Sequence, residues 1–169
     1  MKSSLKYLSN YPEHLRDNIE KMLQENKLKG YLLSRYPDVH NVTNDSALRD
    51  FVMLYKNRYV KQSSPISQIK FDPKIHVIKN ALGTHTYVSR VQGSKLKSKN
   101  EIRVSTLFKK GPEAFLQMIV VHELGHVKEK DHNKAFYQLC RHMLPEYHQV
   151  EFDVRVYLTY VDASGDDLW

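Results

Sequence analysis

The central feature of this 169-residue chain is the segment 118–132, which reads MIVVHELGHVKEKDH. It contains an H-E-x-x-H motif after an aliphatic run, inside a helix predicted over residues 113–128. Because a helix has about 3.6 residues per turn, His122 and His126 lie on one face and can bind one metal ion. Glu123 falls beside them, where a carboxylate can act as general base toward water activated at the metal.

The motif needs a third ligand, because a catalytic zinc ion usually takes three protein ligands and keeps one position open. His132 follows His126 by six residues, and a helix break at residues 129–131 would let the chain turn back toward the metal. Glu151, on a later predicted helix, is the alternative third ligand. Imidazole ligands and an open position favour Zn²⁺, with manganese, nickel and cobalt as other divalent metals that would fit.

Further groups are needed around the ligands. Acceptors usually orient imidazole ligands, and the candidates here are Glu129, Asp131 and Glu151. A donor must stabilise the oxyanion that develops in hydrolysis, and the candidates on the later helices are His142, Tyr147, His148 and Tyr157. The sequence assigns no substrate-binding residue.

The segments around the motif predict a mixture of strands and helices. Short strands are expected over 66–71, 74–79, 84–91 and 101–107, with a basic loop over 93–100. The strand 101–107 precedes the ligand helix and could pair with an extended peptide substrate. After the motif, Asp131 or Asn133 can cap a second helix, Pro145 ends it, and a last helix is expected over 146–160.

The N-terminal third is predicted to be helical. Pro12 fits the first turn of a helix, an apolar stripe follows it, and Gly30 is the expected C-cap. Asn44 or Asp45 can cap a second helix with an apolar and aromatic stripe over residues 48–59. Both stripes indicate packing against a core.

The composition excludes several classes of protein. One cysteine rules out an internal disulfide framework, and 41% hydrophobic residues suffice for a core. The sequence starts without the apolar stretch of a signal peptide and has no aliphatic run of membrane-spanning length, so we expect a cytoplasmic protein with no membrane partner. The net charge of +7 is concentrated in residues 61–110, which hold 11 basic and 2 acidic residues.

Residues 120–137, VVHELGHVKEKDHNKAFY, resemble the ligand segment of the YgjP-like metallopeptidase family, which is akin to SprT-like and Wss-type zincins. In these families a third histidine and an aromatic pair follow the motif, and His132 and the pair 136–137 occupy those places. The resemblance implies an α+β, zincin-like fold with a small antiparallel or mixed sheet packed on the ligand-bearing helix. It also implies that His122, His126 and His132 bind the metal and that Glu123 is the catalytic base.

Three functions are compatible with these observations. The first is a zinc-dependent metallopeptidase acting on a peptide or protein. The second is a metal-dependent hydrolase of phosphate esters or nucleotides, in which the basic segment 90–110 holds the anion. The third is a nucleic-acid-associated module with a structural metal. The expected organisation is an N-terminal helical segment over 1–62, a zincin-like hydrolase domain over 63–162 and a frayed tail over 163–169.

Overall fold

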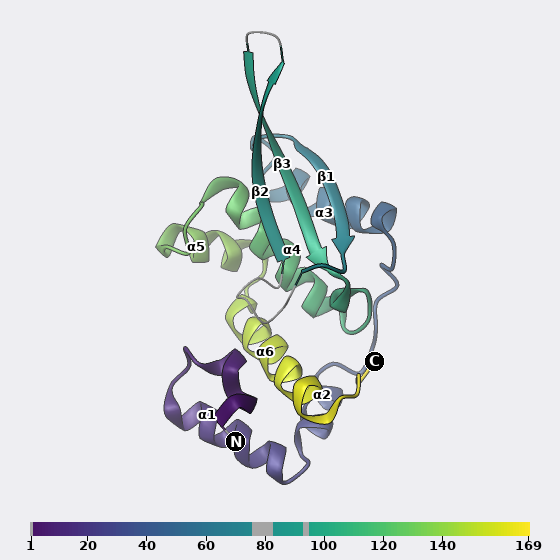
Figure 1. Ribbon diagram of the computed structural model, residues 1–169, viewed down its shortest axis with the longest axis vertical. Helices are drawn as coiled ribbons and strands as arrows, with labels where there is room; N and C mark the ends of the chain where they lie inside the picture. The colour runs from purple at the N-terminus through teal and green to yellow at the C-terminus, as the bar shows by residue number, and fades with distance from the viewer. Residues whose placement is uncertain (1, 76–82, 93–94) are drawn as a thin grey trace.

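The computed structural model describes residues 2–75, 83–92 and 95–169, which form an α+β fold that combines helices with a small sheet (Figure 1). Among these residues, no helix is both long and apolar enough to cross a membrane. The elements in chain order are η1 (Lys2–Leu8), α1 (Glu13–Gln24), α2 (Leu28–Arg35), α3 (Asp45–Tyr59), β1 (Ile66–Asp72), β2 (Gly83–Gln92), β3 (Lys95–Ser105), η3 (Thr106–Lys109), α4 (Glu113–Lys128), α5 (Lys134–Met143) and α6 (Tyr147–Ser164).

The sheet has the strand order β1–β3–β2, with β1 parallel and β2 antiparallel to β3. Ile102 of the central strand is aligned with Ile69 of β1 on one side and with His85 of β2 on the other. The far end of the β2–β3 hairpin extends away from the helices (Figure 1). Because β3 has a neighbour on each side, the prediction that its residues 101–107 could accept a peptide strand is wrong.

The basic stretch predicted as a loop over 93–100 is a strand from Lys95 onward. Its backbone pairs with β2, beginning with Lys95 opposite Gln92. This pairing overrides the low strand propensity of Lys, Ser and Asn. β3 ends at Ser105, where the 3-10 helix η3 takes over. For the strand predicted over 74–79, Lys74 lies in a turn, and residues 76–79 lie outside the described residues.

Helix α4 lies at the centre of the fold, and its bounds match the predicted helix 113–128. It contacts β2 and β3 of the sheet and also the helices α3, α5 and α6. A helix covered on most sides must be apolar on most sides, which explains the run at residues 118–121. The polar residues in the buried part of this helix are those of the H-E-x-x-H motif, and packing alone does not explain their presence there.

The N-terminal helices differ from the prediction at one join. Asn26 has a φ of 56° and separates α1 from α2, so Gly30 lies within α2 instead of ending a single long helix. Asparagine tolerates this left-handed conformation better than most residues. Asn44 caps α3 as predicted, because its side chain accepts a hydrogen bond from the Ala47 N–H.

A buried carboxylate connects the N-terminal helices to α6. Asp153 is 0% exposed and accepts hydrogen bonds from the Tyr31 hydroxyl at 2.7 Å and from Arg35 Nε at 3.2 Å. The Tyr36 hydroxyl and the Gln149 amide donate to the same carboxylate. Residues before and after position 62 also share one hydrophobic core. The helical segment is therefore packed into the fold as one body with the rest.

The residues predicted as a frayed tail, 163–169, include the last turn of a helix and contacts with the core. Helix α6 continues to Ser164 and ends at Gly165, whose φ of 75° is the left-handed conformation that favours glycine at a C-cap. Beyond it, the Trp169 indole donates to the Tyr36 carbonyl at 3.1 Å. Its ring also packs against Phe115 and Tyr157, which holds the end of the chain against the core.

Candidate metal centre

Three imidazoles converge at the C-terminal end of α4. The Nε2 atoms of His122 and His126 are 3.2 Å apart, as expected for positions one turn apart. The chain turns after α4, and His132 places its Nε2 atom 2.9 Å from that of His126 and 3.3 Å from that of His122. Among the described residues, these three form the group of side chains that could hold a metal ion.

The donor set fits a divalent metal. Zinc–nitrogen bonds of about 2.0–2.1 Å at tetrahedral angles would place the nitrogens about 3.3–3.4 Å apart, close to the three separations in this triangle. Burial, with help from the neighbouring imidazoles, lowers the pKa of His122 to about 3. Burial also lowers the pKa of His126. Both rings are therefore neutral at pH 7, which is the protonation state that binds a metal.

The second nitrogen of two of these rings has a fixed partner. His126 Nδ1 lies 2.9 Å from the Glu129 carbonyl, which can only accept, so Nδ1 carries the proton and Nε2 keeps its lone pair. His122 Nδ1 lies 2.7 Å from the Tyr147 hydroxyl. If His122 Nε2 faces a metal, its Nδ1–H donates to Tyr147. Both contacts therefore direct the lone pairs toward the centre of the triangle.

Tyr147 is the start of a longer chain of contacts. Burial, together with the charge of the Glu151 carboxylate, raises the pKa of the Tyr147 hydroxyl. Glu151 lies 3.5 Å from the Arg155 guanidinium, and Arg155 Nη1 donates to the Tyr7 carbonyl at 3.1 Å. Glu151, the alternative third ligand, thus lies outside the imidazole cluster and supports it through Tyr147. The sequence named both residues as candidates but assigned Tyr147 to a different role.

Glu123 is buried in α4, directly after His122 in the chain. Its side chain is 1% exposed, and its Oε2 atom has no hydrogen-bond partner among the described residues. Burial raises the pKa of Glu123 to about 8. A buried carboxyl oxygen without a partner costs stability, which makes Glu123 a candidate for a chemical role.

The ring of Phe136 packs against all three imidazoles. Its ring stacks on His126 at 4.5 Å between centroids, with 28° between the ring planes, and its centroid lies 5.1 Å from that of His122 and 5.0 Å from that of His132. Gly125 permits this approach, because a Cβ atom there would lie 2.7 Å from Phe136 Cε2. Asn133 caps α5 by accepting from the Phe136 N–H at 2.9 Å, which fixes the start of that helix.

A cavity of about 590 Å³ lies beside the triangle and is lined by His122 and His132. Its other walls come from the N-terminal segment and from α6, including Lys6, Glu151 and Arg155. The approach of the N-terminal residues to the site could not be predicted from the sequence, because their position depends on tertiary packing. The predicted helical segment therefore contributes directly to the surroundings of the metal centre.

The other residues named from the sequence lie in different parts of the structure. His148 lines the cavity, whereas His142 packs on Tyr59, and Tyr157 packs in the core against Phe115. Among the residues expected to orient the imidazoles, Glu129 contacts His126 through its backbone carbonyl and not through its carboxylate. In the basic segment, Arg103 is neutralised by Asp72 and Glu101, each at 3.4 Å. The side chains at positions 90, 95, 97 and 99 are not among those that the structure describes.

Three converging imidazoles in an α+β fold, next to a buried carboxyl group and an open cavity, define a candidate metal-dependent enzyme. Comparison with known proteins agrees with this class. The family model "YgjP-like, metallopeptidase domain" matches residues 38–154. The chain therefore belongs to the YgjP-like family, which confirms the resemblance of the ligand segment.

A curated relative extends the comparison to nearly the whole chain. UTP pyrophosphatase from Escherichia coli (strain K12) is 55% identical over 166 residues, which are 98% of this chain and 99% of the relative. No solved structure matches the chain. Family and relative together support a metal-dependent hydrolase, and they differ in the substrate that their names suggest.

Proposed function

We propose that this protein is a zinc-dependent hydrolase that cleaves UTP to UMP and pyrophosphate at the His122–His126–His132 centre. The observation that carries the proposal is the 55% identity to a UTP pyrophosphatase over 98% of the chain. The cavity beside the imidazoles supports it, because Lys6 and Arg155 line that cavity and cations favour a polyphosphate substrate. This reading favours the nucleotide hypothesis over the peptidase hypothesis.

The chemistry assigns a separate task to each residue. A divalent metal, when bound, supplies the Lewis-acid chemistry that makes water a nucleophile near neutral pH. His122, His126 and His132 would hold it through Nε2, with the Tyr147 hydroxyl and the Glu129 carbonyl fixing the first two rings. Three nitrogen ligands with an open position are typical of catalytic zinc.

Glu123 would act as the general base. It accepts a proton from water while the water oxygen bonds to the α-phosphorus. The bond between the α-phosphorus and the oxygen that bridges it to the β-phosphate breaks. Pyrophosphate leaves with this oxygen and the electron pair, and UMP carries the oxygen from water. Glu123 then returns this proton to the departing pyrophosphate oxygen.

A peptidase is the second candidate function. The matched family model is described as a metallopeptidase domain, and the same imidazoles and carboxyl group could hydrolyse an amide. β2 is an edge strand, so an extended peptide could pair with it instead of with β3. The nucleic-acid hypothesis and the cytoplasmic location stay predictions from the sequence.

The test compares the two substrate classes on one preparation. Protein loaded with one equivalent of zinc is incubated with UTP and, separately, with casein-type peptides, and the products are separated by chromatography. We expect UMP and pyrophosphate from UTP, with both products lost after chelation. Cleavage of peptides without hydrolysis of UTP would establish the second candidate, and hydrolysis of neither would overturn both.

A further inference from the structure

The N-terminal segment supplies one wall of the cavity at the metal centre. Lys6, Ser9, Asn10 and Tyr11 line this cavity together with His122 and His132. These four residues precede the region matched by the family model, which begins at residue 38. The matched domain therefore contains the imidazole cluster, while part of the adjoining cavity is built from outside it.

The wall is held in place before any substrate arrives. Leu8 is 0% exposed and anchors η1 in the core. Just before it in the chain, the Tyr7 carbonyl accepts from Arg155 Nη1 at 3.1 Å, and Lys6 Nζ pairs with Asp162 at 3.1 Å. Tyr11 packs on Phe152 of α6 with 5.1 Å between ring centroids. A surface fixed in this way loses little freedom on binding a ligand.

We propose that the segment 6–11 is the nucleotide-binding wall of the cavity. Lys6 binds the phosphate chain of a nucleoside triphosphate, and the side chains of Ser9 and Asn10 hydrogen-bond its nucleoside. This inference rests on the proposed function, since it presumes that a nucleoside triphosphate is the substrate.

The chemistry of the wall fits this ligand. A volume of about 590 Å³ lies within the usual range of about 300–1,000 Å³ for small-molecule sites. Lys6 forms an ion pair with Asp162, with the two side chains 36% and 37% exposed, and its ammonium also lies 5.1 Å from the centre of the Tyr7 ring. Such a surface ion pair is weak enough for a phosphate to replace it. Ser9 and Asn10 are exposed, and a hydroxyl and an amide offer both donors and acceptors for a base or ribose.

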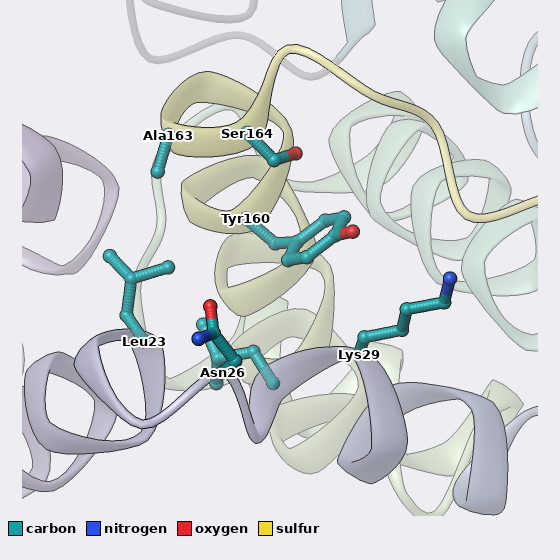
Figure 2. Close-up of a pocket in the computed structure, with 7 residues that line it drawn as sticks. Leu23, Asn26, Lys29, Tyr160, Ala163 and Ser164 are labelled. Carbon is teal, nitrogen blue, oxygen red and sulfur yellow. The ribbon is translucent and has the colours of Figure 1, made fainter.

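A second cavity provides a matched control. It is lined by Asn26, Lys29, Tyr160 and Ser164, at the contact between the start of α2 and the end of α6 (Figure 2). It also has an exposed lysine and polar groups, but no member of the imidazole cluster lines it. Lys29→Ala therefore removes the same charge as Lys6→Ala without touching the metal centre.

The experiment measures two constants on each variant of the zinc-loaded protein. One is the KM for UTP, and the other is the inhibition constant of inorganic triphosphate, which has phosphates and no nucleoside. Lys6→Ala should raise both about tenfold, because it removes a charge-assisted contact. Asn10→Ala should raise the KM for UTP about fivefold and leave the inhibition constant unchanged, because it removes a neutral hydrogen bond. Lys29→Ala should change neither constant.

The outcomes separate this inference from the proposed function. A wild-type protein that does not hydrolyse UTP overturns the proposed function itself. An active wild type whose constants are unchanged in Lys6→Ala and Asn10→Ala overturns the nucleotide-binding wall alone. An equal effect in Lys29→Ala also overturns the nucleotide-binding wall, because it would indicate a general effect of charge. Loss of zinc from Lys6→Ala overturns it as well, because Lys6 would then support metal binding. Zinc content is therefore measured for every variant.

Discussion

At the scale of single residues, the position of Glu123 predicts a separation of metal binding from turnover. Glu123→Gln keeps the shape of the side chain and removes the basic oxygen, so we expect the zinc to stay and the rate of hydrolysis to fall by about 10²–10⁴-fold. Metal analysis and an assay with UTP check this on one preparation. His132→Ala is the contrasting variant, since it removes a proposed ligand and should lose the zinc. Undiminished turnover in Glu123→Gln would contradict the assigned base.

Tyr147 gives a second prediction at this scale. Its hydroxyl, 2.7 Å from His122 Nδ1, is replaced by hydrogen in Tyr147→Phe, which leaves the imidazole without the partner that fixes its orientation. We expect the dissociation constant for zinc to rise about 10–100-fold, measured by competition with a chelator.

The matched control for Tyr147→Phe is Tyr157→Phe. Tyr157 lies on the same helix, but its ring packs against Phe115 and Trp169 instead of an imidazole. Its variant should bind zinc like the wild type. Equal affinities in all three proteins would show that the Tyr147 contact does not support the metal.

At the scale of elements, the contact between α4 and α5 depends on Gly125. A Cβ atom at this position would lie 2.7 Å from the Phe136 ring and 3.2 Å from the Cys140 sulfur. Both neighbours are fully buried, so Gly125→Ala should destabilise the fold by about 1–3 kcal/mol through overpacking, measured by urea denaturation. Because Phe136 contacts all three imidazoles, zinc affinity should fall as well.

Gly30 offers the matched control for this helix contact. It lies within α2, and a Cβ atom there would meet nothing within 4 Å. Gly30→Ala should therefore stabilise the protein by about 0.5–1 kcal/mol, because alanine restricts the unfolded chain and favours a helix. A loss of stability in Gly30→Ala equal to that in Gly125→Ala would remove the steric explanation.

The elements also show what a sequence can and cannot predict. The bounds of α4 could be predicted because a long apolar run with two histidines one turn apart has few other interpretations. The start of β3 could not, because Lys95 is in a strand only through its pairing with β2. The proximity of His132 to the motif followed from sequence spacing, whereas the cavity wall at Lys6 depends on packing across more than a hundred residues.

At the scale of the whole molecule, Asp153 holds α2 against α6, the helix that contacts both the cavity wall and the imidazole cluster. It holds Tyr31 and Arg35 of α2 against α6, and α6 also carries Tyr147, Glu151 and Arg155. The contacts from the Tyr7 carbonyl to His122 pass through that helix. Movement of α6 would therefore alter both the orientation of an imidazole and the position of the N-terminal wall.

This connection predicts a joint loss of stability and function in Asp153→Ala. The change leaves two tyrosine hydroxyls and a partly exposed guanidinium without their buried acceptor, so we expect a loss of about 3 kcal/mol in the free energy of unfolding. Urea denaturation measures this loss, and the KM for UTP should rise because the wall at residues 6–11 is less well fixed. Asp50→Ala, at an exposed position of α3, should match the wild type in both measurements. A destabilised Asp153→Ala protein with an unchanged KM would show that the N-terminal helices stabilise the fold without shaping the cavity.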